Sequence, residues 1–203
     1  MESHFFTFKV EDLINTYKQN LLAQQGDNIN PKDKTQFETV LFEIETKEKA
    51  LDSRKRACNK EFFLNLDILI NNLITSKKIK NGFAVCSSGT PTASVYVNHF
   101  EKGAMSDLSK ALRKKFRHSK IKALLNLFNK DDEETEGKTD ADLKKARTKK
   151  VIPTAKATAI GRSALVLIID GKLSLGKFDN VVYAEFDFDP KATFTVALFS
   201  DAN

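Results

Sequence analysis

The chain has 203 residues and a mass of 22.8 kDa, the size of one ordinary domain or two small ones. Hydrophobic residues (41%) suffice for a core, and charged residues make up 30%. The longest apolar run, 164–169, is far shorter than the ~20 residues of a membrane helix, and the first residues resemble no signal peptide. We therefore expect no membrane partner and, with two cysteines, no disulfide framework.

The net charge of +6 is concentrated in the middle of the chain. Residues 102–122 carry a net charge of +7, residues 131–142 carry −6, and residues 143–150 carry +5. The parts of the chain on either side are close to neutral. Blocks of one sign indicate a directed electrostatic contact, or a tether that folds back on itself.

Apolar residues recur at helical spacing in the N-terminal part of the chain. A short amphipathic helix is predicted over 9–24, before Gly26. Helical periodicity then covers 37–51 and 62–73, with the polar stretch 52–61 between them. Residues 33–75 therefore form either one long helix or two helices with a polar joint.

The pattern becomes β-like after Gly82. The runs 83–88 and 94–100 are predicted to form a hairpin around the turn-rich residues 89–92. A third amphipathic helix, rich in basic residues, is predicted over 105–129. Residues 130–150 hold almost no large apolar side chain and are interpreted as an exposed linker.

Hydrophobicity alternates with a period of two in the C-terminal part. The pair Asp170-Gly171 lies between two apolar runs and predicts a tight hairpin. Further alternation completes a four-stranded antiparallel meander over 157–199.

Together these patterns predict an α+β fold: N-terminal amphipathic helices, a β-hairpin, a basic helix and a C-terminal four-stranded antiparallel meander. The predicted organisation is a mainly helical domain over 1–130 with the hairpin at 83–100, a charged linker over 131–152, and the meander over 153–203. The meander is small, so we expect it to pack on the first domain or on a partner.

Catalytic and metal-binding motifs are absent from the sequence. The histidines stand alone, and no cysteine belongs to a metal-ligand pair. The segment 86–92 lacks the nucleophile-elbow and phosphate-loop patterns, and Cys86 is interpreted as a small core residue. Asp187 and Asp189 are interpreted as turn residues. We therefore expect no catalytic residue, no metal, no cofactor and no enzymatic activity.

The basic helix is the most informative feature of the sequence. Its cations recur every three or four residues, beside an apolar face that can anchor the helix. Such a row matches the phosphates of a nucleic acid, and the arm 143–150 extends it. A solvated helix face is the alternative interpretation, and a membrane surface is less favoured. The predicted nucleic-acid contacts are Lys110, Arg113, Lys114, Arg117, Lys120, Lys144, Lys145, Arg147, Lys149 and Lys150.

Two functions follow as hypotheses. The first is a non-enzymatic nucleic-acid-associated protein that contacts the phosphate backbone. The second is a structural or assembly subunit, for example of a virus- or phage-like particle, because charge blocks of alternating sign suit pairing between subunits. The expected partners are thus nucleic acid or other protein subunits, including further copies of the chain. The expected location is the reducing cytoplasm or the inside of a viral particle.

Overall fold

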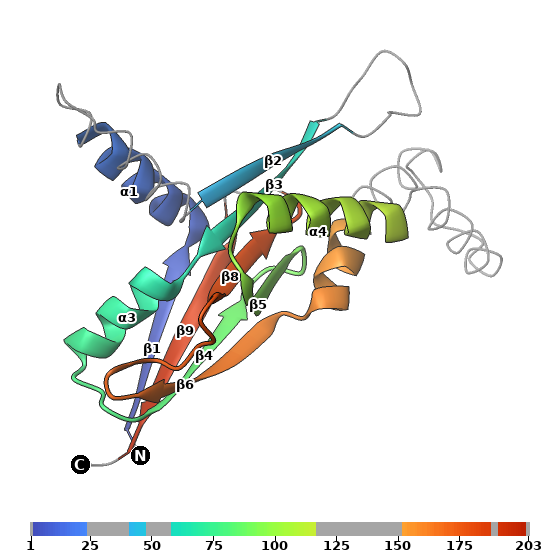
Figure 1. The fold of residues 1–203 in the computed structure, drawn as a ribbon. Helices are drawn as coiled ribbons and strands as arrows, with labels where there is room; N and C mark the ends of the chain where they lie inside the picture. Colours follow the sequence, from blue (N-terminus) through green and yellow to red (C-terminus); the bar gives the residue numbers. More distant parts are fainter. Residues whose placement is uncertain (1, 24–40, 48–57, 117–151, 188–190, 202–203) are drawn as a thin grey trace, which may run out of the picture.

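The computed structural model describes residues 2–23, 41–47, 58–116, 152–187 and 191–201, and for 17–23, 41–47 and 58–60 only the backbone (Figure 1). These parts form helices and two antiparallel sheets, which confirms the α+β class. The helices are α1 (Val10–Ala23), α3 (Asp67–Ser76), α4 (Lys102–Lys115) and one over 152–160, called helix 152–160 below.

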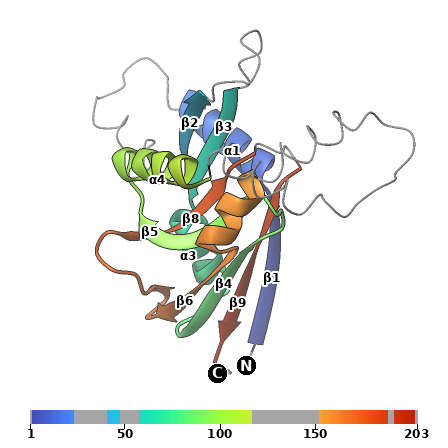
Figure 2. The ribbon, with the colours of Figure 1, turned by 90° about the vertical axis from the view of Figure 1, so that its right-hand side faces the viewer.

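Sheet A contains strands from both ends of the chain, in the order β1-β9-β4-β6-β7. The first strand pairs with the last, so that Phe5 lies opposite Ala197. Figure 2 shows β1, β9, β4 and β6 side by side. The strands are β1 (Glu2–Lys9), β9 (Thr193–Ser200), β4 (Gly82–Ser88), β6 (Ser163–Ile169) and β7 (Lys172–Leu173).

Sheet B has the order β2-β3-β8-β5. All its pairings are antiparallel, and Phe62 of β3 lies opposite Glu185 of β8. Its strands are β2 (Leu41–Lys47), β3 (Cys58–Asn65), β8 (Asp179–Glu185) and β5 (Ala93–His99).

The main core lies between the two sheets. Inward side chains such as Leu64 of β3 and Leu198 of β9 are fully buried there. The helices α1 and α3 add to this core, each with two buried residues four positions apart, which places them on one helix face. Those residues are Val10, Ile14, Ile70 and Ile74.

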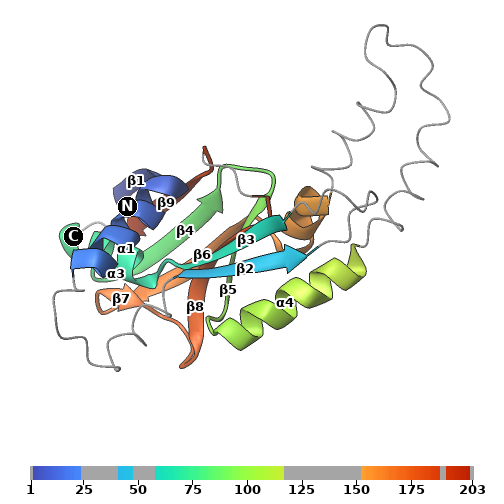
Figure 3. The same ribbon diagram turned by 90° about the horizontal axis from the view of Figure 1, so that it is seen from above.

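A second apolar layer covers the other face of sheet B. Met105 and Leu112 of α4 pack there with Ala157 of helix 152–160, on Phe63 and Phe186. Seen from above, sheet A and α4 lie on opposite sides of sheet B (Figure 3). We call this space between sheet B and the two helices the helix-side layer. It positions the candidate site described below.

The helices predicted over 33–75 are largely wrong. Residues 41–47 and 58–65 are strands β2 and β3, and only α3 keeps part of the predicted helix. The apolar run that starts at Phe62 fits a helical stripe because β3 is buried on both faces, so apolar residues do not alternate along it. At the N-terminus, α1 lies within the range predicted for a helix, but β1 before it was not predicted.

The hairpin predicted over 83–100 is also wrong. Both strands exist, but β4 belongs to sheet A and β5 to sheet B, so the turn between them connects the two sheets. Each strand finds its hydrogen-bond partners elsewhere in the chain, which local patterning does not reveal.

The four-stranded C-terminal meander is wrong as well. Its predicted start forms helix 152–160, β8 lies in sheet B, and β9 pairs with β1 and β4. Within it the tight hairpin is confirmed: β6 pairs with β7 around Asp170 and Gly171. Both turn residues have positive φ, 51° and 78°, as a two-residue turn of this kind requires. The predicted linker and the end of the basic helix lie outside the described residues, and the domain boundaries stay a prediction.

Candidate functional site

A buried ion pair joins helix 152–160 to sheet B. Nζ of Lys156 lies 2.8 Å from Oε1 of Glu61, and the two side chains are 4% and 1% exposed. Glu61 and Phe63 are two residues apart on β3, and side chains alternate along a strand. The side chain of Glu61 therefore points to the same side of the sheet as Phe63, into the helix-side layer. Removing two charges from water is expensive, so such a pair contributes little to stability by itself.

The second carboxylate oxygen of Glu61 has no hydrogen-bond donor among the described residues. The hydroxyl of Ser109 likewise has no partner there. Ser109 lies on the buried side of α4, between Met105 and Leu112, so both unpartnered atoms belong to the helix-side layer. Buried polar groups nearly always find a partner, so these two atoms are the unusual feature of the layer.

Two side chains of β5 bring further polar atoms to the same layer. Ser94 donates a hydrogen bond of 3.0 Å to the carbonyl oxygen of Ala157, next to Lys156. The hydroxyl of Tyr96 lies 3.5 Å from the sulfur of Met105. Burial, and then the negative charge of Glu61, raise the pKa of Tyr96, so its hydroxyl remains a hydrogen-bond donor at neutral pH. We call Glu61, Lys156, Ser94, Tyr96 and Ser109 the Glu61–Lys156 site.

A second buried carboxyl group, that of Glu185, lies across sheet B from this site. It points between the two sheets, where it accepts hydrogen bonds from the hydroxyl groups of Thr92 (2.7 Å), Tyr183 (2.9 Å) and Thr90 (3.3 Å) and from the backbone N–H of Asp187 (3.3 Å). Burial raises its pKa, and these donors lower it in part. Because its oxygens have donors, Glu185 ties the β4–β5 turn to β8.

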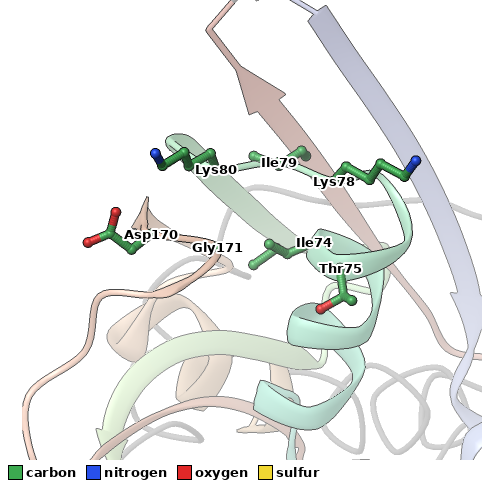
Figure 4. A pocket seen from close by; sticks show the side chains of 7 residues that line it. All are labelled: Ile74, Thr75, Lys78, Ile79, Lys80, Asp170 and Gly171. Atoms are coloured by element: carbon green, nitrogen blue, oxygen red, sulfur yellow. The ribbon is translucent and has the colours of Figure 1, made fainter.

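A shallow depression of about 330 Å³ lies between the end of α3 and the β6–β7 turn (Figure 4). Ile74 and Ile79 form its apolar part, and Thr75, Lys78, Lys80, Asp170 and Gly171 complete the lining. The charged ends of Lys78 and Lys80 point away from each other. None of these lining residues is a buried polar residue, so the depression shows no polar group that lacks a partner.

The residues predicted to contact nucleic acid separate into two groups. Lys110, Arg113 and Lys114 lie on α4, where Lys110 pairs with Asp107 at 2.9 Å and Nε of Arg113 donates to the carbonyl oxygen of Ser109 at 3.4 Å. The remaining predicted contacts lie outside the described residues: Arg117, Lys120, Lys144, Lys145, Arg147, Lys149 and Lys150. Their role stays untested by the structure.

The residues of the Glu61–Lys156 site were not predicted from the sequence. Glu61 closes the polar stretch 52–61, where a carboxylate attracts no notice. Lys156 carries a clearer signal, because it is the one charged residue in the otherwise apolar and small-residue segment 151–160. An isolated charge in such a segment indicates a buried charge that needs a partner. The partner is 95 residues away, which no local pattern shows.

No described helix is long and apolar enough to cross a membrane. Among the residues with described side chains, no three His, Cys, Asp or Glu groups gather in a way that could hold a metal ion. The expected absence of a metal or cofactor stays a prediction.

Comparison with known proteins places the fold. Residues 54–201 match the family described as UPF0047 protein YjbQ-like. None of the curated proteins matches the chain significantly. The solved structures below are all under 20% identical to the chain, so they support the fold alone.

One similar structure is an uncharacterized conserved protein of the YjbQ/UPF0047 family from Clostridium acetobutylicum (17% identity, 79% of this chain and 99% of that chain, TM-score 0.51). Another is a hypothetical protein from Aeropyrum pernix K1, with 18% identity and a TM-score of 0.51; the match covers 79% of this chain and 97% of that chain. A third is a YbjQ-like protein of unknown function from Sulfolobus solfataricus P2, with 12% identity and a TM-score of 0.54; the match covers 98% of this chain and 100% of that chain.

These matches overturn the two functions expected from the sequence. The matching family and structures are described as YjbQ-like, uncharacterized or of unknown function, and none of these descriptions names a nucleic acid, DNA or a virion. The expectation of a nucleic-acid-associated protein, or of a subunit of a virus-like particle, is therefore wrong. Lys110 and Lys114 are exposed on α4, and a solvated helix face, the alternative that the sequence left open, stays a prediction for them.

Proposed function

The chain belongs to the YjbQ-like UPF0047 family over residues 54–201, a range that contains both Glu61 and Lys156, and we propose that it binds a small polar molecule at the Glu61–Lys156 site. One observation carries the proposal: a fully buried carboxylate oxygen of Glu61 has no hydrogen-bond donor among the described residues. Leaving such an atom unpaired costs about 1–3 kcal/mol or more.

The chemistry of the site defines the ligand class. The free oxygen of Glu61 requires an N–H or O–H donor on the ligand. Lys156 has three N–H donors, of which one is directed at Glu61, so it can also donate to an acceptor atom of the ligand. Because the charges of the pair cancel, an uncharged ligand fits best. A molecule with adjacent donor and acceptor atoms, such as a carboxamide or a nucleobase, meets these conditions.

Binding requires no reaction, so this proposal keeps the expectation that the chain is not an enzyme. Conversion of a bound molecule into a product would contradict that part of the proposal. A single buried water would also satisfy the oxygen of Glu61 and is the outcome that competes with a ligand.

Thermal unfolding of the purified chain in the presence of single nucleobases and primary carboxamides tests the proposal. A ligand whose concentration is about 100 times its dissociation constant stabilises the protein by ~2.7 kcal/mol. This raises the melting temperature by about 5 °C or more for a chain of this size. The variant Glu61→Gln should lose this shift, because the amide no longer offers a carboxylate to the donor.

The matched control is Asp107→Asn, which neutralises a carboxylate in the exposed pair with Lys110 on α4. It should keep the full ligand-induced shift. The proposal is wrong if no member of the panel stabilises the native protein, or if Glu61→Gln and Asp107→Asn respond equally to the ligand.

A further inference from the structure

The outer face of sheet A, turned away from the core, carries several large apolar side chains that are exposed. Alternation along β6 sends Val166 and Ile168 into the core and Leu165, Leu167 and Ile169 to the outside. Leu165 is 63% exposed and Leu167 is 54% exposed. An antiparallel strand with one solvated face alternates apolar and polar residues, whereas a strand covered on both faces is continuously apolar. The sequence of β6 is of the second kind.

The apolar surface continues across the sheet. By strand register, Leu167 lies opposite Phe83 of β4, which lies opposite Phe199 of β9. The rings of Phe83 and Phe199 are stacked, with their centroids 4.7 Å apart. The ring of Phe5 on β1 packs edge-on against Phe199, with the centroids 5.9 Å apart. Phe5 is itself 66% exposed. The patch therefore spans β6, β4, β9 and β1, and it is contiguous.

Charge is almost absent from this face although 30% of the chain is charged. The outward positions of sheet A hold two charged residues, both near its margins: Lys9 at the end of β1 and Lys172 of β7, which lies opposite Ile169. Such a face gains nothing from a charged partner, so neither a nucleic acid nor an acidic protein fits it. Its apolar centre can meet an identical centre without electrostatic repulsion, as a two-fold interface requires.

The size of the face suits a stable contact. Four strands about 4.8 Å apart, each rising ~3.3 Å per residue over seven or eight residues, cover roughly 450 Å² in plane. Side chains that stand on this plane bring the accessible area toward the ~800 Å² per partner of a standard interface. Two twisted sheets can pack face to face at about −30°, as in a β-sandwich.

We propose that the outer face of sheet A, centred on Phe5, Phe83, Leu165, Leu167 and Phe199, is a homotypic interface that packs on the same face of a second copy of the chain. This inference does not depend on the ligand proposed above. It uses the opposite side of the molecule from the helix-side layer.

Sedimentation velocity of the full-length protein at about 1–100 µM, a range that spans micromolar dissociation constants, tests the proposal. The native chain should sediment as an oligomer at the upper concentrations. Leu167→Lys should raise the dissociation constant by more than about 100-fold and give a monomer, because two-fold packing buries the new charge in each copy. A circular dichroism spectrum and melting temperature close to native show that this variant remains folded.

Ile68→Lys is the matched control, because Ile68 is 53% exposed on α3, outside sheet A. It should keep the oligomer. A native protein that stays monomeric at about 100 µM overturns the proposal, and so does a Leu167→Lys variant that associates as strongly as Ile68→Lys. Monomeric protein that binds phosphatidylcholine vesicles through this face would replace a second copy with a lipid surface, and would equally overturn it.

Discussion

The hydroxyl of Thr92 donates a hydrogen bond of 2.7 Å to the carboxyl group of Glu185, whose side chain has almost no contact with solvent. This contact holds the turn between β4 and β5, which carries the chain from sheet A to sheet B, against the end of β8. Since the two strands of that turn do not pair with each other, side-chain contacts of this kind fix its position. The buried carboxyl group also makes the stability of the fold depend on pH.

We expect native stability to fall, relative to Glu185→Gln, as pH rises. Burial raises the pKa of Glu185, so the folded state holds the proton more tightly than the unfolded state does. The contribution is fully present below the unfolded pKa of about 4.3 and is lost as pH rises through the higher folded pKa. Urea unfolding of both proteins at a series of pH values measures the difference.

The comparison with Glu185→Gln isolates this group, because burial also raises the pKa of Asp67 and both proteins contain Asp67. Thr92→Val removes a donor that lowers the pKa of Glu185. In this variant the loss of stability with rising pH should therefore continue to a higher pH. A difference in unfolding free energy between the two proteins that is constant with pH, or that shifts in favour of the native protein as pH rises, would contradict the assignment.

Lys156→Met should destabilise the protein by about 3–5 kcal/mol, because it leaves the buried carboxylate of Glu61 without its cation. Lys110→Met breaks the exposed pair with Asp107, which has a similar N–O distance of 2.9 Å, and should change stability by less than ~1 kcal/mol. Chemical denaturation of the two variants beside the native protein gives both values. Equal effects of the two changes would show that the Lys156 pair is not buried as described.

Gly82→Ala should destabilise sheet A by about 2 kcal/mol or more, since overpacking against rigid backbone is costly. A Cβ at this position would lie 1.9 Å from the carbonyl oxygen of Phe199 on the neighbouring strand. Gly103→Ala on α4 is the matched control. A Cβ there would make only an ordinary van der Waals contact, 3.8 Å from Oε1 of Glu101, and alanine favours the helix by about 0.5–1 kcal/mol. Thermal unfolding should show a lower melting temperature for Gly82→Ala and a higher one for Gly103→Ala. An unchanged melting temperature of Gly82→Ala would refute the close approach of the strands.

The thiol of Cys86 should be unreactive in the folded protein. Burial, and then the charge of Asp67, raise its pKa to about 12, so almost no thiolate is present at neutral pH. In a Cys58→Ser variant Cys86 is the remaining cysteine, and a chromogenic disulfide reagent should label it only after denaturant is added. Rapid labelling of the native variant would show that β4 is accessible from the core side.

Local chemistry determined which features could be predicted from the sequence. The hairpin at Asp170-Gly171 was recognisable because both residues tolerate positive φ and two apolar runs flank them. The apolar side of α4 was also recognisable, since Leu108 and Leu112 recur at helical spacing. In both cases the cause lies within a few residues.

The remaining features depend on distant contacts. Glu185 alternates with apolar residues along β8 and would face solvent on a one-sided sheet, but sheet B is covered on both faces. For the same reason β3, buried on both faces, resembled a helix. The pairing of Lys156 with Glu61 joins segments 95 residues apart, so only the folded chain brings the site together.

The most direct test of the Glu61–Lys156 site is the free energy of unfolding of the double variant Glu61→Leu/Lys156→Met, measured without and with the panel of nucleobases and carboxamides. If the pair exists to bind a ligand, two apolar side chains of similar size should leave the free protein as stable as the native one or up to ~4 kcal/mol more stable. The same variant should show no ligand-induced stabilisation. A double variant that is less stable by more than about 2 kcal/mol, together with a native protein that no ligand stabilises, would contradict the account and make the pair purely structural.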